Sequence, residues 1–341
     1  MLGTSCWWRQ LSQSPALARA IGMCKYRKPM KVFLAGATGA IGRRLVPMLV
    51  KSGHEVTGMT RAEEKLDVLR SAGAHGVVCD VFDAEAVGSV VSEAAPDVVV
   101  HELTDLPKDI DPRKMAKQAA GNDRLRVEGT RNLVAAALAA GSRRMVAQSI
   151  AFAYAPTGAR VKDESEPLYD DAPWPWSRSV EALHELERAV TETDGIDGLV
   201  LRYGFFYGPG TSYASDGYYA AEARKRRLPV VGRGTGIFSF VHVDDAASAT
   251  VAAVERGSPG IYNVVDDDPA PMSEWVPRYA EVVGARKPLR VPRLVARLIA
   301  GAYTTQMATE LRGASNERAK RELGWAPRYP SWRDGFREAL G

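Results

Sequence analysis

Three glycines at a spacing of three residues, Gly36, Gly39 and Gly42, separate an apolar stretch from a helix-like one. Residues 31–35 (KVFLA) predict a buried strand, and residues 41–51 predict the helix that follows it. A helix N-terminus presents unpaired N–H groups and the positive end of its dipole, and both favour a bound phosphate. Gly36 would allow a tight turn, Gly39 a close approach of phosphates, and Gly42 close packing of the helix on the sheet. The loop therefore predicts a dinucleotide site, contacted by Gly36, Thr38, Gly39, Ala40, Ile41 and Gly42.

Short apolar runs and longer helical stretches alternate through the first half of the chain. Further strands are expected at 55–59, 76–79, 97–101 and 144–149, and helices at 62–71, 84–94 and 113–140. This alternation predicts right-handed crossovers and a parallel sheet covered on both faces. We therefore expect an α/β fold, a Rossmann-type doubly wound parallel sheet with a smaller C-terminal substrate lobe.

The second half is less regular. Residues 155–176 are rich in Pro, Asp and Gly and predict a long loop, followed by a helix at 177–193 and a strand at 198–203. Later helices are expected near 218–227, 244–255, 273–283 and 316–323. We assign residues 30–203 to the NAD(P)-binding domain and residues 204–341 mainly to the substrate lobe, with some segments returning to the sheet.

Composition and charge argue against several classes of protein. A net charge of +4 over 341 residues does not suggest a nucleic-acid partner. The three cysteines are too few and too scattered for a disulfide framework or a zinc site, so no metal is expected. No run of about 18 apolar residues occurs, so we expect no membrane partner and a cytoplasmic location. The basic run at 224–227 is either the solvated end of a helix or an anion clamp at the substrate pocket.

Residues 1–29 contain no Asp or Glu and carry two adjacent tryptophans, Trp7 and Trp8. This composition fits a transit-like or membrane-surface leader, and equally a translation start upstream of the natural one, because Met30 directly precedes the first expected strand. We expect a dispensable extension.

The choice of cofactor is read at the end of the second strand. An acidic residue there would hold the 2′-hydroxyl of NAD, but the chain has Met59-Thr60-Arg61 and no acid before Glu63. The Arg61 guanidinium could pair with the 2′-phosphate of NADP, or it could be a solvated residue. We expect NADP, with NAD possible. Asp80 is placed to accept from the adenine amino group, and the remaining residues expected at the cofactor are Val81 and His101.

The chain resembles the extended short-chain dehydrogenase/reductases, the group that contains NAD-dependent epimerases and dehydratases. The resemblance covers residues 30–341 and rests on GATGAIG (36–42), EGTRNLVAAA (128–137), LRYGFFYGPG (201–210), FVHVDDAA (240–247) and RELGWAP (321–327). It implies a homodimer paired through the long helix and the helix that follows the 155–176 loop, where the alanine-rich stretch 135–140 would allow close packing.

The family's catalytic pair is a Tyr whose pKa is lowered by a Lys one helical turn later. In one register these positions hold Ser177 and Glu181, and in another Ser179 and Leu183; neither supplies a phenol or an ammonium. The chain therefore resembles an atypical branch that keeps the cofactor loop without the pair.

Two further departures concern the substrate. The family's Asn on the long helix corresponds to Arg126, and Asn122, one turn earlier on the same face, could replace it. Where family members that act on nucleotide sugars commonly carry an Arg, this chain has Phe238. An apolar ring cannot bind a diphosphate, so we do not expect a nucleotide-sugar substrate.

Ser149 and Tyr154 are the expected catalytic residues. Ser149 ends the fifth strand, where the family places a substrate-orienting hydroxyl, although that position could instead fall on Ile150. Tyr154 could donate a proton to a carbonyl, or pack as a half-buried ring. Residues expected to contact substrate are Glu102, Asn122, Tyr203, Phe205 and Phe238.

Other residues have structural alternatives. His184 is expected to be exposed or structural, and His242 to cap or pack. Trp174 and Trp176 could form an apolar lid over the hydride-transfer site, or simply pack a proline-rich loop.

Together these features predict an NADP-dependent oxidoreductase that reduces a carbonyl or enone of a small metabolite. Two alternatives stay open: an epimerase or dehydratase with tightly bound NAD(P), and a regulator that senses NADP without turning it over. Oxidation of added NADPH in proportion to product would separate them.

Overall fold

A computed structural model of the chain describes residues 28–106 and 115–341. The expectations for the extension, including Trp7, Trp8, Cys6 and Cys24, therefore lie outside the described residues, as does the expected start of the long helix at residue 113.

The centre of the fold is a sheet of seven strands, all parallel, in the order β12-β7-β5-β4-β1-β2-β3. Its strands are β1 (Lys31–Ala35), β2 (Glu55–Thr60), β3 (His75–Val78), β4 (Val98–His101), β5 (Arg144–Ile150), β7 (Asp197–Tyr203) and β12 (Gly260–Val264). The strand order runs outward from β1 in both directions, so the sheet is doubly wound, as expected. The strand β12 comes from the second half of the chain and was not predicted.

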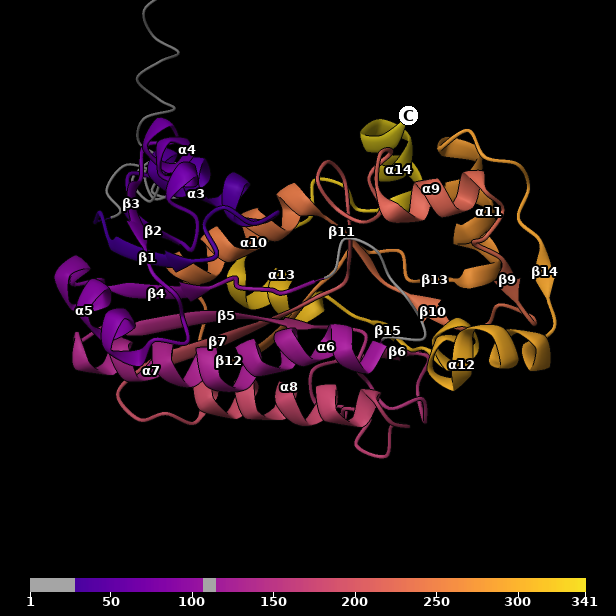
Figure 1. The fold of residues 1–341 in the computed structure, drawn as a ribbon, viewed down its shortest axis with the longest axis horizontal. Helices are drawn as coiled ribbons and strands as arrows, with labels where there is room; N and C mark the ends of the chain where they lie inside the picture. The colour runs from indigo at the N-terminus through magenta and orange to yellow at the C-terminus, as the bar shows by residue number, and fades with distance from the viewer. Residues whose placement is uncertain (1–27, 107–114) are drawn as a thin grey trace, which may run out of the picture.

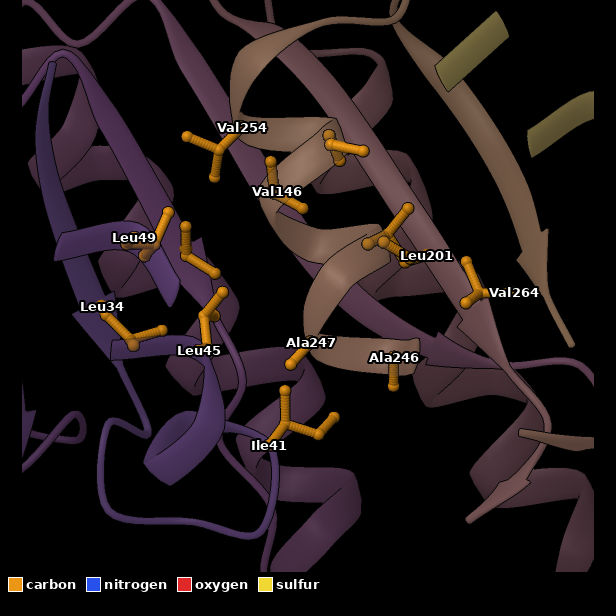
Figure 2. Close-up of a cluster of buried hydrophobic side chains, with 14 of the residues drawn as sticks. Leu34, Ile41, Leu45, Leu49, Val146, Leu201, Ala246, Ala247, Val254 and Val264 are labelled. Atoms are coloured by element: carbon orange, nitrogen blue, oxygen red, sulfur yellow. The ribbon is translucent and has the colours of Figure 1, made fainter. Parts of the chain in front are cut away.

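Helices cover both faces of this sheet (Figure 1). On one face α3 (Gly42–Lys51) packs beside α10 (Val243–Glu255), which lies more than 190 residues later in the sequence. Figure 2 shows apolar side chains of both helices and of the sheet in one cluster, which includes Leu45 of α3, Ala247 of α10, and Val146 and Leu201 of the sheet. The opposite face is covered by α5 (Ala84–Ala94), α7 (Thr130–Ala139) and α8 (Trp176–Thr191).

The long helix has a local irregularity. It consists of α6 (Met115–Arg124), a π-helical turn at Leu125–Gly129 and α7. Single π-turns inside α-helices occur frequently at functional sites. This turn carries Arg126 and faces α8, which places it beside the region where the chemistry is expected.

The C-terminal lobe is built around aromatic side chains. Tyr207, Phe240, Trp275, Trp332 and Phe336 are buried in one cluster. The lobe contains the short strands β8 (Phe205–Tyr207), β9 (Val230–Val231), β10 (Ile237–Phe238), β11 (Phe240–His242), β13 (Ala270–Pro271) and β14 (Arg290–Val291), and the helices α9 (Tyr218–Arg224), α11 (Met272–Val282), α12 (Arg293–Glu310) and α14 (Trp332–Leu340). The helix α13 (Glu317–Leu323) packs instead against β12 and α10. The helices α12 and α14 were not predicted.

Candidate functional site

The loop between β1 and α3 has the geometry of a phosphate cradle. Gly36 has a φ of +96°, and a Cβ atom there would lie 2.5 Å from the carbonyl oxygen of Glu102. A Cβ atom on Gly42 would lie 2.2 Å from the carbonyl oxygen of Gly36, so the third glycine packs against the turn itself. Because side chains at these positions would clash with the neighbouring backbone, glycine is needed to hold the turn, and the residues present fit a dinucleotide whose phosphates approach the backbone.

The other residues expected at the cofactor follow the carboxyl ends of β2 and β3. The hydroxyls of Thr38 and Thr60 lie 3.5 Å apart, which joins the loop to the end of β2. Arg61 follows directly and is exposed, so its guanidinium is accessible to a ligand. Asp80 is exposed beyond β3, where it accepts from the amide of Phe82, and Val81 is buried, with its carbonyl bound by Asn132.

The residues at the end of β4 point in opposite directions, as neighbouring strand residues do. The His101 ring is buried, lies 3.1 Å from the Thr130 hydroxyl, and accepts from the Leu103 amide. Burial lowers the pKa of His101 to about 4, so the ring is neutral at physiological pH. These contacts are structural, and a role of the side chain toward the ribose stays a prediction.

Glu102 turns toward α10. Its Oε1 accepts from the Tyr203 hydroxyl at 2.9 Å and lies 3.4 Å from the Thr250 hydroxyl, while Oε2 is buried and has no partner among the described residues. Burial raises the pKa of Glu102 to about 8, and the two hydroxyls only partly offset it. The group is therefore a neutral acid at pH 7, which leaves no carboxylate charge beneath the phosphate loop.

The two expected catalytic residues, Ser149 and Tyr154, are joined by one buried network. The Ser149 hydroxyl donates to Oε1 of Glu187 at 2.7 Å. Arg202 donates to both oxygens of Glu187, at 2.8 and 2.6 Å, and donates to the Tyr154 hydroxyl at 3.0 Å. The Tyr154 hydroxyl in turn donates to Oδ1 of Asn263 at 2.8 Å.

The electrostatics of this network favour the charged form of Arg202 at its centre. Burial opposes the charge of Arg202, but the hydrogen bonds and the charge of Glu187 outweigh it and raise the pKa of Arg202. Burial also raises the pKa of Tyr154, and Arg202 offsets this only in part. Both hydroxyls are thus held by neighbouring polar groups, and Tyr154 is a weaker acid than a free phenol.

The burial of α8 distinguishes the two registers for the missing pair. Ser179 and Leu183 are buried, whereas Ser177 is half-buried and Glu181 is exposed. The inward face therefore presents Ser179 and Leu183, followed one turn later by Glu187. No phenol or ammonium stands at either pair of positions.

The Ser179 hydroxyl donates to Asp123 of the long helix at 3.0 Å. Asp123 also pairs with Arg126 at 3.2 Å, and Arg126 lies in the neighbourhood of Tyr303. Asn122 is buried one turn away and accepts from the Asp105 amide. A role for Asn122 toward substrate stays a prediction.

A cleft with aromatic walls opens beside Tyr154. Trp176 and Tyr303 form part of it, with ring centroids 5.0 Å apart, and Gln306 donates to the Tyr169 hydroxyl at 2.6 Å. The residues that line the cleft are Phe152, Tyr154, Pro156, Tyr169, Trp176, Tyr303, Gln306, Met307, Glu310 and Leu311.

The expected substrate residues lie at different distances from this cleft. Phe205 stacks on Phe152 at 4.3 Å and contacts Phe238 at 4.9 Å, so both stand behind the cleft wall. Glu102 and Tyr203 belong to the cluster below the phosphate loop and do not line the cleft.

Sequence reasoning missed Glu187, Arg202, Tyr303 and Gln306. One signal was available: Arg202 interrupts the apolar strand GLVLRY, and a charge in a central strand needs a buried partner. Tyr303 and Gln306 lie on α12, which the sequence did not predict, so no signal pointed to them.

The remaining expectations are structural. His184 lies 2.6 Å from Asp170 at the surface, and His242 caps α10 by accepting from the Asp244 amide. Trp176 lines the cleft, whereas Trp174 is exposed. Within the basic run, Arg227 pairs with Glu222 and Arg226 binds the Lys287 carbonyl, which favours the solvated helix end over an anion clamp.

Residues 28–106 and 115–341 lack two features that would point to other kinds of site. No group of three His, Cys, Asp or Glu residues in these ranges could hold a metal ion. No helix in them has the length and apolar character needed to cross a membrane.

Residues 32–264 match the model of the NAD dependent epimerase/dehydratase family. The 3-diazoavenalumate denitrifying reductase of a Streptomyces species is 50% identical over 311 residues, which cover 90% of this chain and 99% of that protein. Two solved structures share the fold. The UDP-glucose 4-epimerase of Thermus thermophilus, complexed with NAD, aligns with a TM-score of 0.67 and 23% identity over 90% of this chain and 97% of its own. A human epimerase family protein with NADPH aligns with a TM-score of 0.68 and 21% identity over 90% and 98%.

These relationships agree with the geometry of the site. The phosphate cradle, the doubly wound sheet and the reductase at 50% identity all point to a nicotinamide-dependent enzyme. The chain belongs to the NAD dependent epimerase/dehydratase family, and it is an oxidoreductase.

Proposed function

We propose that this enzyme reduces a small aromatic diazo compound with NADPH, replacing the diazo group by hydrogen and releasing N2. The name of the 50% identical reductase supports this chemistry. The observation that carries the proposal is that the two expected proton donors are already engaged: the hydroxyls of Ser149 and Tyr154 are both committed to the buried network of Glu187, Arg202 and Asn263.

Reduction of a carbonyl needs a proton for the oxygen that receives negative charge. The Tyr154 hydroxyl could supply one only by leaving its bond to Asn263, and burial makes it a weaker acid. An aromatic diazonium ion has no such need. A hydride forms the new C–H bond, the C–N bond breaks, and its electron pair leaves with N2, so atoms and charge balance without a proton.

The walls of the cleft offer surfaces on which a flat aromatic substrate could pack. Trp176 and Tyr303 offer ring faces, Phe152 is backed by Phe205, and the polar atoms of Gln306 are directed toward Tyr169. Stacked or edge-on aromatic pairs each contribute about 0.5–1.5 kcal/mol beyond the apolar area they bury. A substrate packed between these walls would be shielded from water, which otherwise competes as a nucleophile for a diazonium carbon.

The loop at 36–42 would hold the pyrophosphate of the cofactor, and the reduced nicotinamide, when bound, supplies the hydride. We propose NADP rather than NAD because Arg61 is exposed at the end of β2 and no carboxylate precedes Glu63.

The test uses 3-diazoavenalumate and NADPH that carries deuterium at the transferred position. We expect one deuterium on the ring carbon that lost nitrogen and one NADPH oxidised for each N2 released. Enzyme-free mixtures give the background reaction between the two compounds. Consumption of NADPH with a panel of ketones and enones, but not with the diazo compound, would contradict the proposal and favour the carbonyl reductase expected from sequence.

Tyr154→Phe provides a second discriminator. If the reaction needs no proton, the variant should keep kcat within about threefold once it is saturated with substrate. A carbonyl reductase that uses Tyr154 as its acid should lose about 100-fold or more. Saturable NADPH binding without any oxidation would instead identify a regulator, and turnover without net oxidation would identify an epimerase or dehydratase.

A further inference from the structure

The first half of α12 exposes large apolar side chains. Leu294 is 77% exposed, Leu298 is 88% exposed and Ile299 is 70% exposed, and Leu289 on the preceding segment is also exposed. Leu294 and Leu298 lie one helical turn apart, so they form one stripe. Such patches mark interaction surfaces more often than single exposed residues do.

Arginine and lysine side chains border this stripe, with no acidic side chains among them. Arg286, Lys287, Arg290 and Arg297 are exposed, and none of them forms an ion pair with a described residue. No Asp or Glu occurs between Val282 and Thr309 in the sequence. We call the four cations together with Leu289, Leu294, Val295, Leu298 and Ile299 the α12 surface.

The α12 surface is held firmly by the lobe beneath it. Ala296 is buried against the aromatic cluster on the inner side of the helix, and β14 pairs with β9. Gly301, with a φ of +83°, breaks α12 just after the exposed half, and the second half lines the aromatic cleft. Figure 1 shows α12 and β14 at the end of the molecule opposite α5.

We propose that the α12 surface docks on an anionic lipid bilayer. Exposed leucine and isoleucine on a helix, bordered by arginine and lysine, are features of a helix that binds at a membrane interface. Each arginine or lysine near an anionic membrane surface adds its own attraction, so the contributions of these four cations add up. The helix would lie on the membrane, which agrees with the finding that no described helix can cross one. This departs from the expectation that the chain has no membrane partner.

Charge decides between the possible occupants. A second copy placed symmetrically on this surface would bring like charges together, because both copies present the same patch. Residues 1–27 contain no Asp or Glu, so they offer no charge complementary to these cations. Anionic lipid headgroups complement the cations, and the acyl region accepts the apolar side chains.

The experiment is flotation of the full chain with vesicles of phosphatidylcholine alone or with one quarter phosphatidylglycerol. We expect binding to the anionic vesicles that is at least tenfold stronger than to the neutral ones and that falls when salt is raised. Leu294→Asp with Leu298→Asp should reduce binding at least tenfold, and so should Arg290→Gln with Arg297→Gln, which leaves the apolar stripe intact.

The matched control is Val68→Asp on α4 (Leu66–Ser71), since Val68 is 51% exposed and lies far from α12. It should bind like the original chain, and NADPH titration should show that each variant is folded. Equal binding to both kinds of vesicle, no binding to either, or a shift from dimer to monomer in Leu298→Asp without vesicle binding would each overturn the proposal. The last result would identify the surface as a contact between copies.

Discussion

The buried acid below the phosphate loop makes a quantitative prediction about stability. Burial holds the pKa of Glu102 at about 8, against an ordinary value of 4.5 in an unfolded chain. A carboxyl group whose pKa is raised by folding makes its full contribution to stability only at a pH where it is protonated in both states. The contribution is therefore complete below pH 4.5 and is lost progressively as the pH rises to about 8.

The size of this loss follows from the two values. A difference of roughly 3.5 pH units, at about 1.4 kcal/mol per unit, amounts to about 5 kcal/mol between pH 4.5 and pH 8. Glu102→Gln keeps the oxygen that accepts from Tyr203 and cannot ionise. Glu102→Gln places an amide nitrogen at the unpartnered Oε2 position, and the free-energy cost of burying it does not change with pH. The pH dependence of the difference in unfolding free energy therefore reports the ionisation of Glu102 alone.

The assay is urea denaturation of both proteins at intervals between pH 5 and pH 9. We expect the stability of the original chain, relative to Glu102→Gln, to fall steadily up to about pH 8 and then level off. Glu128→Gln is the control, because the hydrogen bond from Arg124 lowers the pKa of Glu128 and its ionisation is complete below this range. Parallel curves for the original chain and Glu102→Gln would refute the reasoning.

Three further predictions concern the cofactor loop and the buried network. Gly36→Ala should abolish saturable NADPH binding in a fluorescence titration, because the alanine backbone would have to adopt a φ of +96° and its methyl group would clash with the Glu102 carbonyl oxygen. Arg61→Glu should raise the Kd for NADPH at least tenfold and leave the Kd for NADH within about threefold, since only NADPH carries the 2′-phosphate; equal losses for both would contradict the assignment. Arg202→Met should lower the free energy of unfolding by about 3–5 kcal/mol because it strands the buried Glu187 carboxylate, whereas adding Glu187→Met should recover part of that loss in the same denaturation assay.

Local patterns predicted the parts of the fold that depend on neighbouring residues. The strand 31–35, the glycine loop and the following helix form within a span of about 20 residues, so their hydrophobic pattern and their glycines suffice. The parallel sheet followed from the alternation of strands and helices, and it is confirmed.

The elements that were missed lack such local signals. The helix α12 contains Gly301 and begins after Pro292, and its first half is apolar on the side that faces outward, so its pattern does not indicate a buried face. The strand β12 is a five-residue run (GIYNV) whose only main-chain partner among the described strands is β7, nearly 60 residues earlier. Such pairing is decided by tertiary structure, which a local window does not contain.

The candidate site shows the same division. Ser149 was found from its place at the end of β5 and Tyr154 from its place just after it, but their partners Glu187 and Arg202 lie 38 to 53 positions from Ser149 in sequence. The direction of Glu102 could have been inferred from strand alternation, because His101 and Glu102 must face opposite sides. The hydroxyls that contact His101 and Glu102 could not be inferred from the sequence.

The contribution of β12 and α10 to the central sheet bears on how the chain can be divided. A fragment that ended at Tyr203 would have β7 as an open edge, with unpaired N–H and C=O groups ready to join another chain. It would also expose the apolar side of α3, since α10 would be gone. The cofactor half is therefore completed by the same stretch of chain that builds the substrate lobe. The cofactor half and the substrate lobe form one folding unit and cannot be separated by cutting the chain at Tyr203.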